Sequence, residues 1–345
     1  MSLRVLVTGA GSGVGQAIAK ALRISDLDVT VVFADIDPLN PGFHRAAESV
    51  LIPRVEEPGS LERVIGIIAA NRIDAVMIGS VFDMMFFAEH RAEIERTTGA
   101  LVVVSPPDVI AMATDKWLTA EYLRQHGLPH PRTILVEDVD TAMAGARELP
   151  YPVIVKPRFG RASQSVHVIK DSERLYHALR LIDEPIVQEM IAPPSQKLAA
   201  EYTCSFVKRA SGAVIGPFTA RRSLRSGHSW VVEAGDFTAL HPLLLDIARE
   251  VPCFGPFNVQ LMVGPSGPVP FEFNPRFSGT TAMRAHFGFN EPAMVLRAER
   301  LGERVETPAY ADGTAFRFLE EVYVDAPPEA LSTPPFRQGV VNDWF

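Results

Sequence analysis

The sequence FNVQLMVGPSGPVPFEFNPR, residues 257–276, decides the fold. Two runs in which apolar residues alternate with other residues are joined by the loop GPSGP, and this pattern predicts a β-hairpin. Successive side chains of a strand point to opposite faces. Asn258 and Gln260 are therefore expected on one face of the first strand, and Glu272 and Asn274 on one face of the second.

A hairpin that is symmetric about its loop places Gln260 opposite Glu272 and Asn258 opposite Asn274. Directly opposed Cβ atoms are about 4.5–5.5 Å apart, so these polar side chains converge beside one carboxylate. Mg²⁺ prefers one or two carboxylates together with phosphate oxygens and water. We therefore predict a site for Mg²⁺ (or Mn²⁺) at Glu272, Asn274 and Gln260, with Arg276 placed to meet a phosphate on the metal. The alternative is a solvated polar face of the sheet.

A second group of residues precedes the hairpin. Residues 152–157 (PVIVKP) have the pattern of a buried strand that ends at Lys156, and residues 166–169 return as a strand. The loop of small residues between them can fold its N–H groups over a triphosphate, and Lys156 supplies a point charge. The Walker pattern and the kinase signatures His-Arg-Asp and Asp-Phe-Gly are absent from the sequence, which argues against a P-loop enzyme or a protein kinase.

The remaining pattern predicts two kinds of sheet. Residues 1–104 alternate strands and helices, which predicts a Rossmann-like α/β domain with a parallel sheet. From Asp108 to Gly127 the pattern is helical, and Gly127-Leu128-Pro129 ends it. From Tyr151 onward short alternating strands with Gly/Pro turns predict an α+β part with antiparallel sheets. Phe271 and Phe273 are expected to pack on one face there. Strands are predicted at Leu3–Val7, Val29–Ala34, Val50–Ile52, Ala75–Ile78 and Leu101–Val104, and helices at Val14–Arg23 and Leu61–Asn71.

The glycine-rich run TGAGSGVG, residues 8–15, offers a different function. Together with Asp35 after the second strand, it resembles the nicotinamide site of short-chain dehydrogenases. None of the tyrosines is followed four residues later by lysine, so the catalytic Tyr-x-x-x-Lys of that family is missing. A tight turn with close packing of helix and strand is therefore favoured, and an NAD(P)-dependent oxidoreductase stays the alternative.

Composition limits the class of protein. The 345 residues carry a net charge of −8, which disfavours binding to nucleic acid. The most apolar stretch is too short to span a bilayer, which needs about 20 residues, so we expect no membrane partner. The two cysteines form no Cys-x-x-Cys pair, and the first residues have the pattern of a strand, not of a signal peptide. We expect a cytoplasmic protein.

Taken together, these residues resemble the ATP-grasp superfamily, in particular single-chain carboxylate–amine ligases similar to carbamoyl phosphate synthase. The hairpin with the following Arg276-Phe277-Ser278-Gly279 carries the most specific part of the resemblance. The resemblance implies a pre-ATP-grasp domain at 1–104 and a two-lobed ATP-grasp domain at 105–345, with a nucleotide lobe at about 115–190 and a metal and substrate lobe at about 191–325. It implies nucleotide binding by Lys116, Lys156, Gly160, Ser163, Ser165, Gln188, Glu189, Met190, Ile191 and Glu201.

The implied roles differ along the chain. Residues 160–166 match the phosphate loop, although Arg161 and Ser165 replace positions that usually carry glycine. Residues 187–191 match the hinge that binds adenine through backbone groups, and Glu201 matches an acid near the ribose.

The implied reaction is the ATP-dependent joining of a small carboxylate to an amine or ammonia through an acyl phosphate, with release of ADP. Arg276 and Lys156 would then be catalytic. One or more residues of a cationic stretch would hold the substrate carboxylate or acyl phosphate, unless that stretch is a solvated loop; its members are Arg221, Arg222, Arg225 and His228. A homodimer is implied by the resemblance alone. A catalytically inactive nucleotide-binding homologue is a third interpretation.

Overall fold

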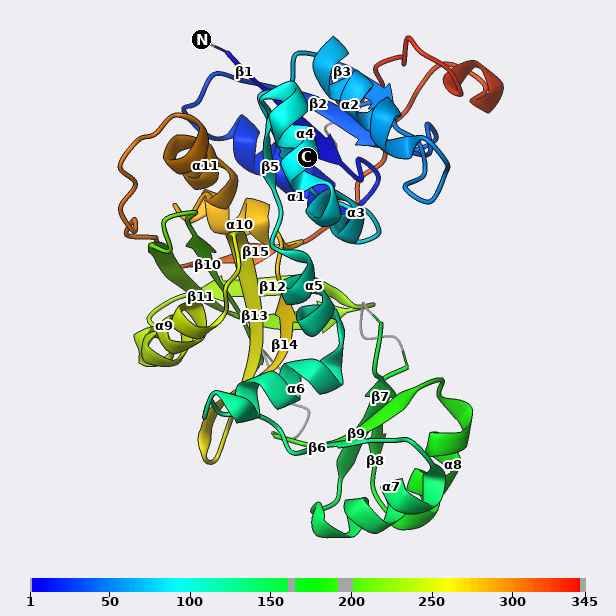
Figure 1. The fold of residues 1–345 in the computed structure, drawn as a ribbon, viewed down its shortest axis with the longest axis vertical. Coiled ribbons are helices and arrows are strands. Elements are labelled where there is room, and N and C mark those ends of the chain that lie inside the picture. The colour runs from blue at the N-terminus through cyan, green and yellow to red at the C-terminus, as the bar shows by residue number, and fades with distance from the viewer. Residues whose placement is uncertain (1, 161–164, 192–200, 342–345) are drawn as a thin grey trace.

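Three sheets follow one another along the long axis of the molecule (Figure 1). The computed structural model describes residues 2–160, 165–191 and 201–341. In this part of the chain no helix is long and apolar enough to cross a membrane.

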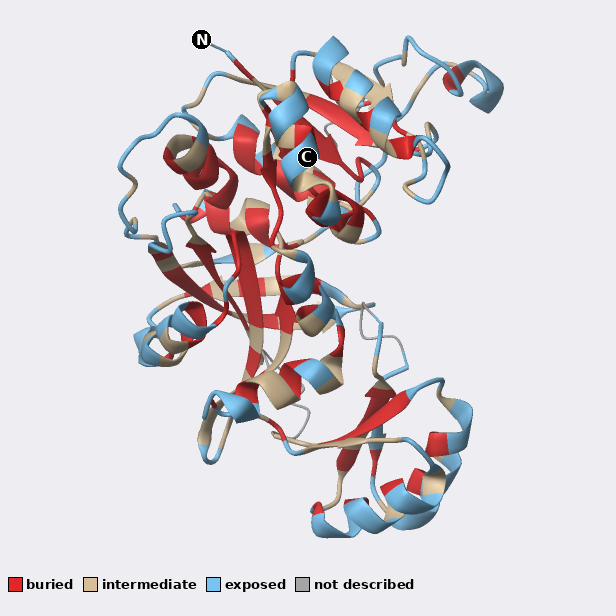
Figure 2. Ribbon diagram, viewed as in Figure 1, coloured by how far each residue is buried: buried red, intermediate tan, exposed pale blue. Residues whose placement is uncertain are grey.

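The first sheet is parallel and has the strand order β3-β2-β1-β4-β5. Apolar side chains are buried on both of its faces, as its short apolar strands predicted (Figure 2). The predicted strands and helices are confirmed to within two residues. Their bounds are Leu3–Thr8 (β1), Gly13–Arg23 (α1), Val29–Asp35 (β2), Glu48–Leu51 (β3), Ser60–Ala70 (α2), Ala75–Met77 (β4), Met84–Glu89 (α3), Arg91–Thr98 (α4) and Leu101–Val103 (β5).

The helical pattern predicted from Asp108 to Gly127 is confirmed, with one interruption that was not predicted. The segment forms two helices, α5 (Pro107–Thr114) and α6 (Lys116–Gln125), which meet at Asp115. The Asp115 carboxylate accepts hydrogen bonds from two backbone N–H groups of the first turn of α6, at 2.9 and 3.2 Å. This cap favours a new helix start over continuation of α5.

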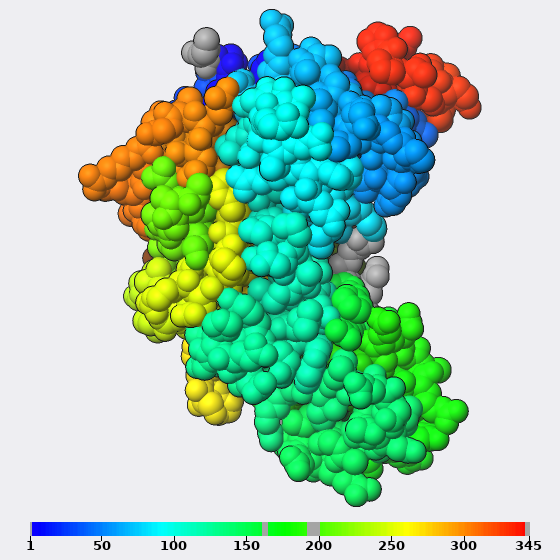
Figure 3. Space-filling view, viewed as in Figure 1, coloured from blue at the N-terminus to red at the C-terminus, as the bar shows by residue number. Residues whose placement is uncertain are grey.

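A small lobe carries a four-stranded antiparallel sheet in the order β6-β9-β7-β8. Figure 3 shows this lobe, coloured green, at one end of the molecule. Its helices pack on one buried apolar cluster. Its elements are Thr133–Leu135 (β6), Val139–Gly145 (α7), Ala146–Glu148 (a 3₁₀ turn), Val153–Pro157 (β7), His167–Ile169 (β8), Ser172–Leu181 (α8) and Pro185–Glu189 (β9).

The large sheet is six-stranded and antiparallel, in the order β14-β13-β10-β11-β12-β15. One face packs on α9 through apolar side chains, and the other faces α10 and α11, which also contact α1 of the first domain. The antiparallel α+β part was predicted and is confirmed. Its elements are Glu201–Lys208 (β10), Val214–Arg225 (β11), His228–Ala234 (β12), His241–Glu250 (α9), Gly255–Gly264 (β13), Gly267–Asn274 (β14), Thr281–His286 (α10), Glu291–Val295 (α11) and Gly313–Phe316 (β15), with short turns at Thr238–Leu240, Leu296–Arg300 and Pro328–Leu331.

The C-terminal segment returns to the first domain. The ring centroids of Phe336 and Phe43 are 4.6 Å apart, and the Gly339 amide donates to the carbonyl of His44 at 2.7 Å. The first domain is therefore completed by residues from the far end of the sequence.

Candidate nucleotide and metal site

The β13–β14 hairpin has the predicted pairing at its polar residues. Gln260 lies opposite Glu272, and Asn258 lies opposite Asn274. The loop, however, is shorter than predicted, because Gly264 pairs with Gly267 and leaves a two-residue turn. The register shifts between Gln260 and Leu261, whose partners are Glu272 and Pro270. This shift compensates for the shorter turn, so the polar pairs keep the register of a longer symmetric loop.

The shift leaves Phe271 without a partner on β13 and interrupts the alternation of faces. Phe273 is buried in the core under α9, but the Phe271 ring lies near the Lys156 ammonium, whose Nζ is 5.6 Å from the ring centroid. The expectation that both rings pack together is therefore wrong for Phe271. The shift instead brings an aromatic ring to the carboxylate side of the hairpin, next to a lysine of the small lobe.

Glu272, Asn274 and Arg276 form a connected polar chain. The Asn274 Nδ2 donates to Glu272 Oε1 at 3.0 Å, and Arg276 Nη2 donates to Asn274 Oδ1 at 2.8 Å. Arg276 Nη1 also donates to the carbonyl of Phe277 at 2.7 Å. Burial lowers the pKa of the Arg276 guanidinium, and the Glu272 carboxylate acts in the opposite direction. A cation is thus held beside the carboxylate with part of its hydration removed.

Two lysines approach the same carboxylate. Lys156, at the end of β7, is only 6% exposed. Burial lowers its pKa to about 8; the nearby Glu272 carboxylate raises it, and the Lys116 ammonium lowers it. The pKa of Lys116 is also lowered by burial and raised by Glu272. Both lysines therefore lie within electrostatic reach of Glu272, although β7 and β14 belong to different sheets.

The start of α6 holds the phosphate-loop region. Lys116 Nζ donates to the carbonyls of Gly160 and Arg158 at 3.2 and 3.4 Å. The Arg158 guanidinium pairs with the buried Asp115 carboxylate at 2.6 Å. Gly160 has a φ of 146°, and Ser165, with a φ of 55°, is exposed. Ser163 and Arg161, which the sequence places in this loop, lie outside the described residues.

Gln188 and Glu189, which the sequence predicts in the hinge, end β9. Gln188 is buried and donates to Thr133 at 2.9 Å, whereas the Glu189 carboxylate pairs with Arg132 at 2.9 Å. The Glu189 amide is bonded to the carbonyl of Arg132, so it is already used within the structure. Met190 and Ile191 follow the strand. Ile191 lies against the hairpin turn, where a Cβ on Gly264 would be 2.7 Å from its carbonyl oxygen.

Glu201 is held by Arg222, a member of the predicted cationic stretch. Arg222 lies 2.5 Å from the Glu201 carboxylate and donates to Gln260 Oε1 at 2.8 Å. The predicted Arg221 pairs with Glu233 at 2.7 Å. Neighbouring residues of a strand face opposite ways, so Arg221 points to the other face of the sheet from Arg222.

Arg225 lies at the exposed end of β11. Its guanidinium is 4.8 Å from the centre of the Trp230 ring. Arg317 is a cation that the sequence analysis did not name. It donates to the carbonyls of Gly279 and Ser229 at 2.5 and 2.9 Å. Its Nη1 is 3.9 Å from where a Cβ on Gly13 would lie, so it reaches the junction with the first domain. The spacing of Arg317 in the sequence carries no signal of this contact.

The donors at the hairpin fit a hard divalent cation. One carboxylate and two side-chain amides lie beside several cations, a set that leaves coordination positions for phosphate oxygens and water. No cluster of three His, Cys, Asp or Glu residues that could hold a metal occurs in the described ranges. The side-chain oxygen of Asn258 accepts from Thr203 at 2.9 Å and from Arg284. The oxygens of Gln260 and Asn274 each accept a hydrogen bond as well, from Arg222 and Arg276 at 2.8 Å, so a metal at these two amides would replace those bonds.

The glycine-rich turn of the first domain is closely packed. A Cβ on Gly15 would lie 2.2 Å from the carbonyl oxygen of Gly9. The Gly11 amide donates to the Asp35 carboxylate at 2.9 Å, so the acid that would bind a ribose occupies the turn itself. These contacts favour a packing role for the glycines.

Comparison with known proteins identifies the architecture. Residues 113–280 match the sequence model of the ATP-grasp domain. This chain belongs to the ATP-grasp superfamily. The sequence is 23% identical over 306 residues to the carbamoyl phosphate synthase large chain of Sulfolobus acidocaldarius, which covers 81% of this chain and 29% of that protein. The chain thus spans less than a third of this relative.

Two solved structures share the fold of this ATP-grasp protein. An N5-carboxyaminoimidazole ribonucleotide synthetase with ADP has a TM-score of 0.72 and 13% identity, over 99% of this chain and 92% of that chain. The biotin carboxylase domain of the Hydrogenobacter thermophilus 2-oxoglutarate carboxylase, a dimer with MgADP, ADP and bicarbonate, has a TM-score of 0.68 and 17% identity, over 88% of this chain and 71% of that chain. ATP-grasp enzymes ligate or carboxylate small molecules through acyl phosphates, with MgATP as the phosphoryl donor.

Proposed function

We propose that this ATP-grasp protein binds MgATP between β7 and the β13–β14 hairpin and transfers the γ-phosphoryl group to a substrate carboxylate. An amine or ammonia then attacks the acyl phosphate, and phosphate leaves as the amide forms. The observation that carries the proposal is the convergence of Lys156, Lys116 and Arg276 on Glu272 from separate elements. Three cations around one metal-ligand carboxylate suit a triphosphate.

Each residue of this group has a distinct part in the proposal. Glu272 and Asn274, with Gln260, would hold Mg²⁺, which when bound offsets charge on the phosphate oxygens. Lys156 and Lys116 would contact the phosphates, and Arg276 would stabilise the charge of the transferring group. Such a reaction depends on positioning and electrostatics and needs no protein nucleophile.

The nucleotide base would lie at the hinge. Gln188, Glu189, Met190 and Ile191 line the end of β9, and we propose that Met190 and Ile191 offer the backbone groups, since the Glu189 amide is already bonded. We propose that Ser165 and Gly160 belong to the phosphate loop.

The acceptor side is proposed at the edge where the large sheet meets the first domain. Arg222, a member of the predicted cationic stretch, shares the carboxylate-bearing face, and Arg317 reaches Gly13. We therefore propose these two arginines, and not Arg221, as the contacts to an acidic substrate. Arg225 is exposed and would reach only a substrate that extends beyond β11. We also propose a homodimer, supported by the dimeric biotin carboxylase domain.

A second candidate has bicarbonate as the phosphorylated carboxylate. It is favoured by the likeness to a biotin carboxylase domain solved with bicarbonate. The resulting carboxyphosphate would carboxylate an amine instead of forming an amide. The same residues would serve both reactions up to the phosphoryl transfer.

The test is a screen for ADP release over pairs of carboxylates and amines, with bicarbonate as one of the carboxylates. We expect ADP and phosphate only when a carboxylate is present, and hydroxylamine should trap the acyl phosphate as a hydroxamate. Formation of AMP and pyrophosphate would overturn the mechanism. Nucleotide binding without turnover for any pair would favour the inactive homologue.

A further inference from the structure

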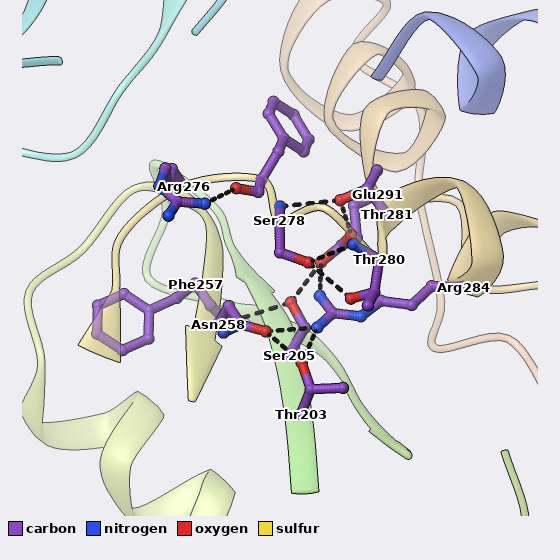
Figure 4. Close-up of polar contacts among 11 residues, drawn as sticks. Thr203, Ser205, Phe257, Asn258, Arg276, Ser278, Thr280, Thr281, Arg284 and Glu291 are labelled. Carbon is purple, nitrogen blue, oxygen red and sulfur yellow. Dashed lines mark hydrogen bonds and ion pairs between the residues drawn. The ribbon is translucent and has the colours of Figure 1, made fainter. Parts of the chain in front are cut away.

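A fully buried ion pair lies behind the hairpin. Arg284 on α10 and Glu291 at the start of α11 are both 0% exposed, and Arg284 Nη1 is 3.0 Å from Glu291 Oε1 (Figure 4). Neither side chain belongs to the proposed nucleotide or substrate set. Charges buried this deeply are rare in soluble proteins unless they are paired and hydrogen-bonded.

The pair is tied to the strands beneath the site. Arg284 Nη2 donates to Thr203 Oγ1 on β10 at 2.8 Å and to the Asn258 side-chain oxygen on β13. Asn258 is the residue directly opposite Asn274. The Glu291 carboxylate accepts from Ser205 Oγ on β10. The ion pair therefore fixes α10 and α11 against the strands that position the hairpin.

The same pair holds the loop that follows the hairpin. Thr281 Oγ1 donates to Glu291 Oε2 at 2.9 Å and accepts from the Ser278 amide at 3.1 Å. Ser278 Oγ is 2.7 Å from Thr280 Oγ1. Ser278 comes only two residues after Arg276. The loop is thus anchored on both sides of Arg276 in the sequence. Asn274, which precedes Arg276, pairs with Asn258, and Thr281, which follows it, bonds to Glu291.

The contacts of this ion pair indicate that it positions the loop more than it stabilises the fold. Replacing a buried ion pair with apolar residues of similar volume is often neutral or stabilising, so such a pair is weak evidence for a stabilising role. We infer that Arg284 and Glu291 are positioning residues, which hold the loop from Asn274 to Thr281 so that Arg276 reaches the γ-phosphate. The inference rests on the proposed function of Arg276.

The test compares the affinities of MgADP and Mg·β,γ-methylene-ATP by calorimetry, because only the second carries a γ-phosphate. We expect the full-length protein to bind the triphosphate analogue about tenfold more tightly, the equivalent of one hydrogen bond to a charged group. Arg276→Met should remove this preference. The double variant Arg284→Met/Glu291→Leu should reduce it to less than about threefold, with MgADP affinity and melting temperature nearly unchanged, which a merely structural pair would not predict.

The double variant avoids leaving either charge buried alone. Two of the three hydroxyls that lose a bond to the ion pair still have an acceptor, because Thr203 Oγ1 donates to Asn258 at 2.9 Å and Ser205 Oγ donates to the carbonyl of Phe257 at 3.1 Å. The third, Thr281 Oγ1, still accepts from the Ser278 amide. A second variant, Thr281→Val, keeps the ion pair and removes its hydroxyl link to the loop. It should lose the preference in the same way.

The matched control is Arg209→Met/Glu299→Leu. This pair is 3.0 Å apart in the same domain, and within the described part of the chain Arg209 bonds only to Glu299 and the carbonyl of Ala298 outside its own turn, not to the loop. The control should therefore keep the tenfold preference. If the wild type shows no preference, or Arg276→Met retains it, the proposed role of Arg276 fails. If those two behave as expected but Thr281→Val, or the folded double variant, keeps the preference, the positioning role is overturned.

Discussion

Replacing Lys156 with methionine should stabilise the protein at pH 7, although it removes a proposed phosphate ligand. Burial lowers the pKa of Lys156 from 10.5 to about 8, so the folded chain binds this proton less tightly than the unfolded chain. One pKa unit corresponds to about 1.4 kcal/mol, so the lysine destabilises the fold by at most about 3 kcal/mol below pH 8. Glu272 loses a favourable neighbour in the variant, and we expect a net gain of about 1–2 kcal/mol.

The pH dependence gives the sign of this effect. Between pH 8 and 10.5 the unfolded chain holds the Lys156 proton and the folded chain does not, so wild-type stability rises with pH relative to Lys156→Met. The difference in free energy of unfolding between Lys156→Met and the wild type should therefore be largest below pH 8 and should decrease towards pH 10.5. Urea unfolding of both proteins across this range measures it.

Two controls sharpen the test. Lys170→Met removes an exposed lysine of the same lobe and should change stability by less than about 0.5 kcal/mol at every pH. Adding MgATP should stabilise the wild type but not Lys156→Met at pH 7. The reasoning is refuted if Lys156→Met is less stable than the wild type at pH 7, or if the difference in free energy of unfolding does not change with pH.

Other predictions follow from single contacts. Glu272→Gln should lower ATP turnover by about 100-fold or more, and full turnover by this variant would remove the metal assignment. It should also lower the melting temperature in the absence of nucleotide, because Lys156, Lys116 and Arg276 lose the carboxylate that they share. Arg222→Lys should lower turnover by about tenfold, because lysine cannot replace the bidentate fork, whereas Arg221→Lys, on the other face, should stay within about twofold; equal effects would contradict the assignment of faces. Gly15→Ala should destabilise by about 1–3 kcal/mol in thermal unfolding, since its Cβ would lie 2.2 Å from a backbone oxygen. A Cβ on Gly66 would have no atom within 4 Å, so Gly66→Ala should stabilise the protein by about 0.5–1 kcal/mol through the helix propensity of α2. A loss of stability in this variant would contradict that reasoning.

The first domain could be predicted closely because its signals are local. Strands buried on both faces of a parallel sheet are apolar along their length, so β1 and β4 stand out in the sequence. The break between α5 and α6 was missed because the helical pattern continues through it. Only the side chain of Asp115, bonded to the next turn, marks the new start, and an aspartate in a helical run is a weak signal.

The site was predictable only as far as local pairing determines it. Gln260 and Glu272 are joined by one short loop, so their pairing followed from the hairpin. The choice between Arg221 and Arg222 depends on how β10 pairs with β11, and that register is shifted between Ser205 and Val207. A shift of one residue exchanges the two faces of a strand, so the sequence could not select the correct arginine.

The distribution of buried charge argues for a bound polyanion more strongly than any single contact does. Burial lowers the pKa of Lys156, Lys116 and Arg276, and the carboxylate common to all three is Glu272. Lys156 is buried, and Lys116 and Arg276 are partly buried; removing three cations partly from water beside one shared carboxylate is unfavourable for the fold alone. The phosphates of a nucleotide would restore the balance of charge, and because Lys156 and Glu272 belong to different sheets, such a ligand would also hold the two lobes together.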